Sequence, residues 1–276
     1  MNEDPDLYSK SCQMQKFDTN HFLDTYFKRL NVKNNVTVLD LGAGDGSVTL
    51  EALLPRLPNF NKLVVSDKSK KMINFAKNRF HDERIEVIQM DILDYDKAFK
   101  DHFDHIFTFH CLNLVPEART PDAMRNIFEM LKPGGNFFAT IIVDASLYEF
   151  CDSMIKDKIW PPAMANYKNF FSPYRGCDNP AEKLTCFLKN AGFDVQFCKY
   201  EERKFTYEHL NQFADYALSI FPVLKVESRD ERAKFAENVK ETIRKHQLAT
   251  SDESTRSDDK VHYFYSVLVA GASKPV

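Results

Sequence analysis

Three glycines alternate with other residues just after a short β-branched segment. Val36–Asp40 predicts a buried strand, and the segment Asp40–Gly46 that follows reads D-L-G-A-G-D-G. Glycines at alternate positions let the chain turn sharply at the carboxyl end of a strand, and they let a ligand approach backbone N–H groups without interference from Cβ atoms. We therefore predict that Gly42, Gly44 and Gly46 form a ligand-binding loop, with an ordinary turn as the plainer alternative.

The acidic residues of this loop indicate the charge of its ligand. Asp40 and Asp45 flank the glycines, and the spacing G-x-G-x-G differs from the G-x-G-x-x-G pattern of dinucleotide-binding folds. Two carboxylates would repel a pyrophosphate, so the loop favours a ligand with a positive end. An oxidoreductase that binds a dinucleotide is the weaker alternative.

Acidic residues also follow the next two predicted strands. Asp67, with Lys68 beside it, ends the second strand, where a carboxylate can accept hydrogen bonds from ribose hydroxyls. Asp91 and Ile92 follow the third strand and offer a carboxylate for an exocyclic amine and an apolar surface for a purine ring. This set fits S-adenosylmethionine, which carries two cationic groups, a ribose and an adenine but no phosphate. The alternative is that Asp67 and Asp91 only cap the helices that come next.

Segments with strand and helix patterns alternate around these residues. Strands are expected at 36–40, 62–66, 85–89, 104–109, 136–143, 194–199 and 261–270. Helices are expected at 7–30, 47–54, 69–80, 121–131, 146–159, 181–190, 207–221 and 229–245. This alternation predicts an α/β fold with a parallel, doubly wound sheet and helices on both faces.

The composition excludes several classes of protein. With 276 residues, of which 43% are hydrophobic, the chain can bury a substantial core and is not disordered, collagenous or a coiled coil. The net charge of -3 gives no general attraction to nucleic acid or to an anionic membrane, so neither is expected as a partner. The acidic N-terminus lacks the pattern of a signal peptide, so a cytoplasmic protein is expected. Either a monomer or a homodimer is expected. The six scattered cysteines indicate neither a disulfide framework nor a metal site.

Taken together, these motifs resemble those of class I S-adenosylmethionine-dependent methyltransferases. The resemblance rests on Val38–Gly46, Asp67, Met90–Ile92 and the loop Leu131–Gly135. The family implies a Rossmann-like, doubly wound, mostly parallel sheet of seven strands whose last strand is antiparallel. It also implies S-adenosylmethionine as the cofactor, with Asp40 near the methionine moiety, Asp67 on the ribose, and Asp91 with Ile92 at the adenine.

A narrower resemblance, over most of the chain, is to the juvenile hormone acid methyltransferases of arthropods. It rests on Leu7-Tyr8, Gln15–Asp18, Asp40–Ser47, Phe107–Leu112, Asn126-Ile127, Leu131–Gly135, Trp160 and Phe171–Tyr174. That family methylates the carboxylate of farnesoic or juvenile hormone acids, and its acceptor is held by a Gln of the N-terminal helix and a Trp after the fourth strand. Gln15 matches the Gln, but Leu114 occupies the position of the Trp and cannot donate a hydrogen bond.

The resemblance therefore implies an acceptor site with one donor missing. A hydrogen bond to a charged group contributes about 1.5 to 3 kcal/mol, so acid recognition should weaken unless His110 or Asn113 compensates. The alternative for His110 is that it only packs against its neighbours. The alternative for the aromatic residues of the cap is that they belong to the hydrophobic core. The expected catalytic residues are Gln15 and His110, with His110 also touching the cofactor. The expected substrate contacts are Gln15, Leu114, Trp160 and Tyr174.

We expect methyl transfer to the carboxylate of a small apolar acid. A free carboxyl group with a pKa of about 4 is already ionised at pH 7, so the reaction needs alignment and exclusion of water but no base. The alternatives are methylation of a different small molecule and a cofactor-binding protein whose turnover is weak or lost because Leu114 replaces the Trp. A single domain, 1–276, is expected, divided into an N-terminal helical cap (1–35), a cofactor-binding core (36–143), a cap insertion (144–190) and C-terminal strands and helices (191–276).

Overall fold

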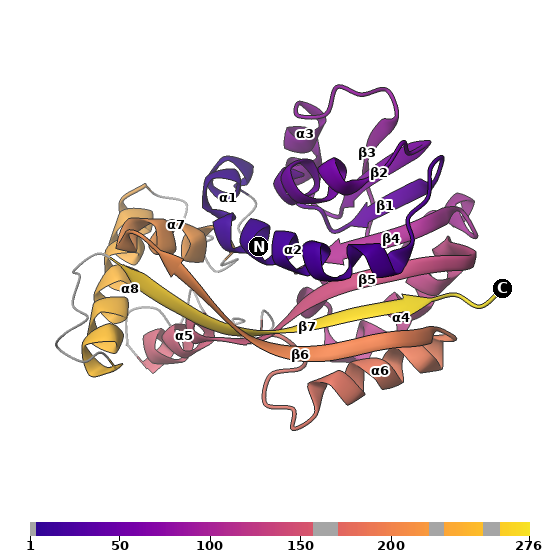
Figure 1. Cartoon of the computed structure of the whole chain (residues 1–276). Coiled ribbons are helices and arrows are strands. Elements are labelled where there is room, and N and C mark those ends of the chain that lie inside the picture. The colour runs from indigo at the N-terminus through magenta and orange to yellow at the C-terminus, as the bar shows by residue number, and fades with distance from the viewer. Residues whose placement is uncertain (1–3, 157–170, 221–228, 251–259) are drawn as a thin grey trace.

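The computed structural model of the chain describes residues 4–156, 171–220, 229–250 and 260–276. Its centre is a seven-stranded sheet in the order β3-β2-β1-β4-β5-β7-β6 (Figure 1). The strands are β1 (Thr37–Leu41), β2 (Lys62–Asp67), β3 (Ile85–Gln89), β4 (Phe103–Phe109), β5 (Leu131–Ala145), β6 (Asp194–Tyr207) and β7 (Val261–Ser273). Strands β1 to β5 pair in parallel, whereas β7 is antiparallel to both β5 and β6. The predicted Rossmann-like sheet with an antiparallel last strand is confirmed.

The helices follow the predicted positions with two differences. They are α1 (Pro5–Ser11), α2 (Gln13–Tyr26), α3 (Lys70–Lys77), α4 (Thr120–Met130), α5 (Ser146–Lys156), α6 (Pro180–Ala191), α7 (Leu210–Ile220) and α8 (Arg229–Thr250). The single helix expected at 7–30 is wrong, because Cys12 has φ -84° and ψ 28° and separates α1 from α2. The helix expected at 47–54 is a π-helical turn, Thr49–Leu53, followed by a 3-10 turn that contains Pro55, which has no N–H to donate.

Side chains alternate between the two faces of the sheet and build two separate cores. Phe107 of β4 and Phe138 of β5 point to the face that is covered by α2 and by the turn Thr49–Leu53. Their neighbours Ile106 and Phe137 point to the opposite face, where α4 and α6 pack. This arrangement buries both faces and leaves the carboxyl ends of the parallel strands as the edge at which a ligand can bind.

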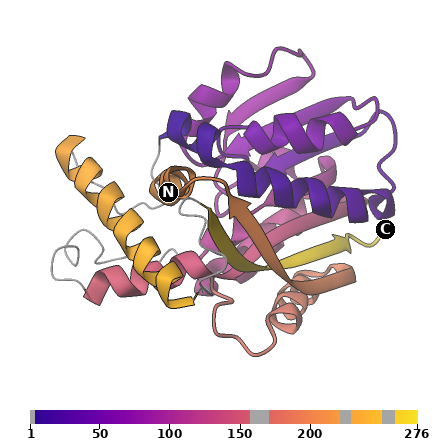
Figure 2. The same cartoon turned by 60° about the vertical axis from the view of Figure 1, so that its left-hand side comes forward.

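A helical cap stands at that edge. Strands β6 and β7 are longer than predicted and pair from Asp194↔Ser273 to Tyr207↔Val261, which carries their hairpin beyond the other strands. Figures 1 and 2 show α5, α7 and α8 gathered around the end of this hairpin, and α1 packs against α7. Helix α6, which belongs to the segment expected as a cap insertion, lies instead on the sheet beside α4. None of the helices in the described ranges is both long and apolar enough to cross a membrane.

Candidate active site

The glycine loop after β1 is held tightly against β2 and β4. The backbone N–H groups of Gly42 and Ala43 both donate to the carbonyl oxygen of Ser66 over 2.8 Å. Gly42 has φ +78°, and a Cβ atom there would lie 2.1 Å from Sγ of Cys111. Only glycine satisfies both constraints, so the loop keeps one backbone shape at the carboxyl end of β1.

Asp40 presents a buried carboxylate at the start of this loop. Its side chain is 1% exposed, and Oδ2 accepts a hydrogen bond from Oγ1 of Thr49 over 2.6 Å. Within the described residues Oδ1 has no partner. Burial raises the pKa of Asp40 to about 7, and the neighbouring charge of Asp67 adds to the rise. A buried, half-satisfied carboxylate of this kind fits a cationic group of a ligand.

Asp67 ties the glycine loop to the end of β2. Its Oδ2 accepts a hydrogen bond from the N–H of Gly44 over 2.9 Å, and its Oδ1 accepts one from the N–H of Ser69 over 2.8 Å. The alternative prediction is that Asp67 only caps the next helix. In the structure Asp67 holds Ser69, and Ser69 is the residue that caps the start of α3. These contacts are compatible with a ribose contact as well, since a carboxylate has about four acceptor positions.

Asp45 and Gly46 are residues of the loop that contact the protein interior. Asp45 is fully buried, accepts hydrogen bonds from the N–H and hydroxyl of Ser47, and pairs with Nη1 of Arg79 over 2.7 Å. A Cβ atom on Gly46 would lie 2.6 Å from the ring of Phe80. Both residues thus shape the loop through the protein interior.

The residues expected at the adenine lie further along the same edge. Lys68 and Asp91 border an open hollow beside β3, and Oδ1 of Asp91 accepts a hydrogen bond from the N–H of Leu93 over 3.0 Å. Ile92 is 8% exposed and packs into the core on the side of α4, where its carbonyl oxygen accepts a hydrogen bond from Asn126 over 2.7 Å. The apolar surface predicted at Ile92 is therefore largely turned into the core.

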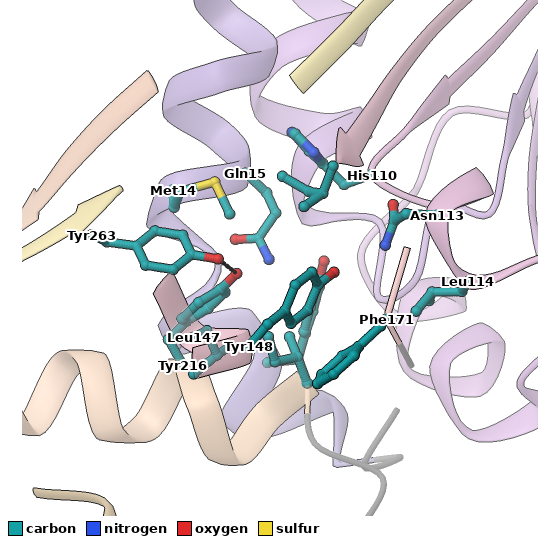
Figure 3. A pocket seen from close by; sticks show the side chains of 13 residues that line it. Met14, Gln15, His110, Asn113, Leu114, Leu147, Tyr148, Phe171, Tyr216 and Tyr263 are labelled. Atoms are coloured by element: carbon teal, nitrogen blue, oxygen red, sulfur yellow. Dashed lines mark hydrogen bonds between the residues drawn. The ribbon is translucent and has the colours of Figure 1, made fainter. Parts of the chain in front are cut away.

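Gln15, His110 and Leu114 come together in one pocket under the cap (Figure 3). The lining of the pocket is mainly apolar and aromatic. Gln15 comes from α2, His110 from the end of β4, and Leu114 from the 3-10 turn Leu112–Leu114. A pocket of this kind is typical of a site for a small apolar molecule.

The other two predicted acceptor contacts are Tyr174 and Trp160. Tyr174 is 1% exposed and packs with Leu184 and Leu188 in the core on the opposite face of the sheet. The prediction that Tyr174 contacts the acceptor is therefore replaced by its alternative, a core role. Trp160 lies outside the described residues.

Several lining residues were missed by the sequence analysis. They are mainly aromatic and include Tyr8, Tyr148, Phe171, Tyr216 and Tyr263. Tyr8 precedes Gln15 by seven residues, two turns of a regular helix, which was a usable signal. Tyr216 and Tyr263 carried no such signal, because α7 and β7 reach the pocket only through the pairing of β6 with β7. Tyr148 comes from α5, directly after β5.

Unpaired polar atoms mark one part of the pocket. Within the described residues, Oε1 of Gln15, Oδ1 of Asn113 and both ring nitrogens of His110 are buried without a hydrogen-bond partner. Nε2 of His110 lies 3.8 Å from Oδ2 of Asp18. Burial, with the nearby charge of Arg203, lowers the pKa of His110 to about 4, so the imidazole is neutral at pH 7. Buried polar atoms without partners are costly, and a polar ligand would satisfy them.

Comparison with known sequences decides the reaction class. Residues 38–135, from β1 to the loop inside β5, match the family described as methyltransferase domain. This protein is an S-adenosylmethionine-dependent methyltransferase. The methyltransferase is 26% identical over 274 residues to juvenile hormone acid O-methyltransferase from Drosophila melanogaster, which covers 97% of this chain and 91% of that one. It is also 26% identical over 221 residues to the Bombyx mori protein of the same name, covering 79% and 78% of the two chains.

The fold of the methyltransferase also agrees with solved structures. Phosphoethanolamine N-methyltransferase 2 from Haemonchus contortus, solved in complex with S-adenosylmethionine, superposes with a TM-score of 0.55 over 93% of this chain and 53% of that chain. The two sequences are 17% identical, so this likeness speaks for the fold alone. S-adenosylmethionine, the cofactor predicted from the sequence, carries cationic groups that match the unpaired carboxylate oxygen of Asp40.

Proposed function

We propose that this methyltransferase acts on the carboxylate of a small apolar acid, of the farnesoic or juvenile hormone acid kind. The observation that carries the proposal is the position of Gln15, whose amide lies in an aromatic and aliphatic pocket under the cap. Such a pocket can bury an apolar chain while a few polar groups orient one oxygen. The names of the two insect relatives support an acid as the acceptor.

The cofactor residues have separate roles in this proposal. The buried carboxylate of Asp40 holds a cationic group of the methionine moiety, and Gly42 and Gly44 let the cofactor approach the backbone. Asp67 binds the ribose and keeps the loop in place through the N–H of Gly44. Asp91, at the rim of the hollow beside β3, meets the adenine end. Lys68, in the hollow beside β3, and His110, in the acceptor pocket, are the remaining proposed cofactor contacts. Asp45, Gly46 and Ile92, which were also predicted to touch the cofactor, face the protein interior and support the site from there.

The acceptor residues position a group that is already reactive. S-adenosylmethionine supplies an electrophilic methyl group; a carboxylate oxygen forms the new O–C bond, and the S–C bond breaks with its electron pair left on sulfur. No proton is transferred, because the acid is ionised at pH 7. Gln15 orients the acceptor, and neutral His110 can donate one hydrogen bond from its ring. Catalysis then consists of alignment and exclusion of water.

An acceptor panel tests this function. The pure protein is incubated with methyl-labelled S-adenosylmethionine and with farnesoic acid, dodecanoic acid, and the matched alcohols farnesol and dodecanol as controls. We expect methyl esters from the acids and no product from the alcohols. Methyl ethers from the alcohols, or no ester at any enzyme concentration, would contradict the proposal. Tight cofactor binding by calorimetry without transfer to any acceptor would favour the alternative of a cofactor-binding protein. The cytoplasmic location and the monomeric or homodimeric state stay predictions.

A further inference from the structure

Tyr8 lies where the glycine loop and the acceptor pocket meet. A Cβ atom on Gly44 would be 3.5 Å from Cε1 of Tyr8, which places the phenol ring against the loop. Tyr8 is also one of the residues that line the acceptor pocket. Helix α1 carries it and is fixed at its start by Asp4, whose side chain accepts a hydrogen bond from the N–H of Leu7 over 3.1 Å. Tyr8 therefore contacts both the glycine loop and the pocket that contains Gln15.

The hydroxyl groups of the pocket tyrosines differ in their partners. Those of Tyr216 and Tyr263 lie 3.3 Å apart and form a hydrogen bond with each other, drawn in Figure 3. The hydroxyl of Tyr148 interacts with the backbone of Ser172. Tyr8 lines the same pocket, with its ring against Gly44. Its pKa is raised well above 10 by burial, so it keeps its proton and stays a donor.

We propose that Tyr8 binds the methyl acceptor, its hydroxyl donating a hydrogen bond to the acceptor oxygen in place of the donor that is missing at Leu114. This inference rests on the proposed function, because an acceptor carboxylate is what the donor binds. A neutral phenol suits the task, since it contributes a donor without adding a charge near the buried carboxyl groups of Asp45 and Asp67, both of which act on Tyr8 electrostatically. A hydrogen bond to a charged oxygen corresponds to roughly a 10- to 100-fold effect on kcat/KM.

The test removes only the hydroxyl oxygen. Tyr8→Phe keeps the ring against Gly44, so we expect kcat/KM for farnesoic acid to fall roughly 10- to 100-fold while the calorimetric Kd for S-adenosylmethionine stays within twofold. Tyr174→Phe is the matched control, because it removes the same hydroxyl group from a tyrosine that packs in the core on the opposite face of the sheet, outside the pocket. We expect this control to retain the wild-type kcat/KM.

Three outcomes would overturn the inference or the function beneath it. A Tyr8→Phe enzyme with kcat/KM within threefold of wild type would overturn the role of the hydroxyl alone. A rise in Kd for S-adenosylmethionine equal to the fall in kcat/KM would also overturn it, because Tyr8 would then act on the cofactor. A wild-type enzyme that methylates no acid of the panel would instead overturn the proposed function. Melting temperatures of each variant show whether it is folded.

Discussion

The hydroxyl of Thr49 donates a hydrogen bond to Oδ2 of Asp40 over 2.6 Å, while Oδ1 of the same carboxylate has no partner within the described residues. Asp40 is buried, so its charge is costly until a cation arrives. Asp40 therefore lowers the stability of the ligand-free protein but provides a binding partner for the cofactor, which is a common property of active-site residues. Two predictions follow from its raised pKa.

The first concerns the stability of Asp40→Asn. Because the pKa of Asp40 is raised from 3.8 to about 7, the folded state holds a proton between these values that the unfolded state has lost. The free energy of unfolding therefore falls as pH rises from about 4 to about 7 and stays low above it. We expect ligand-free Asp40→Asn to be roughly 2 to 4 kcal/mol more stable than wild type at pH 8 and equal to it at pH 4. Urea denaturation at both pH values measures this, and a less stable variant at pH 8 would contradict it.

The second concerns the pH dependence of cofactor binding. Only the ionised form of Asp40 attracts a cation, and in the ligand-free protein this form predominates above pH 7. We expect the affinity for S-adenosylmethionine to fall by up to tenfold per pH unit below 7, with protons released on binding. Calorimetry from pH 5.5 to 8 in two buffers of different ionisation enthalpy measures both quantities. A constant Kd across this range would show that Asp40 does not bind the cation.

Gly42 of the glycine loop and Gly134 of β5 supply a matched pair of variants. Gly42 and Gly134 have nearly equal φ angles, +78° and +77°, but a Cβ atom at Gly42 meets Cys111 at 2.1 Å whereas one at Gly134 has ordinary contacts. We expect Gly42→Ala to lose about 1 to 3 kcal/mol more unfolding free energy than Gly134→Ala, because only the first adds an overlap to the backbone strain. The second substitution Cys111→Gly should recover part of the difference. Equal losses of unfolding free energy in the two single variants would mean that the loop can shift to relieve the overlap with Cys111.

The sheet and the cofactor loop were predictable because their signals are local. Each of these signals depends on only a few neighbouring residues: the β-branched strands, the alternate glycines and the acidic residue after each strand. The structure places Asp40 and Asp67 at one edge of the sheet, as expected. The acceptor pocket depends on distant segments. Tyr216 and Tyr263 meet only because β6 and β7 extend beyond the sheet with α7 between them. Tyr174 was misplaced for a related reason, since aromatic residues of a cap and of a core have the same sequence pattern.

A buried ion pair between α2 and β6 supports the wall of the pocket. Asp18 is fully buried and accepts hydrogen bonds from Nε of Arg203 over 3.1 Å and from the hydroxyl of Tyr265 over 2.6 Å. Asp18→Leu leaves Arg203 buried without this partner, so we expect a loss of about 3 to 5 kcal/mol in unfolding free energy. The double variant Asp18→Leu/Arg203→Met should recover at least half of the loss. Guanidinium denaturation of both variants checks this, and a double variant as unstable as the single one would contradict it.

Leu114 stands where the sequence resemblance to the hormone acid methyltransferases implies a Trp. Leu114 lines the pocket, so Leu114→Trp would bring an indole N–H to the acceptor site. In the Tyr8→Phe background we expect this change to raise kcat/KM for farnesoic acid roughly tenfold, because the indole replaces a lost donor. In the wild-type background the rise should be less than threefold, since Tyr8 already donates. Leu114→Phe in each background is the control that fills similar space without an N–H. Equal effects of Trp and Phe would show that volume, and not hydrogen bonding, governs the acceptor at this position.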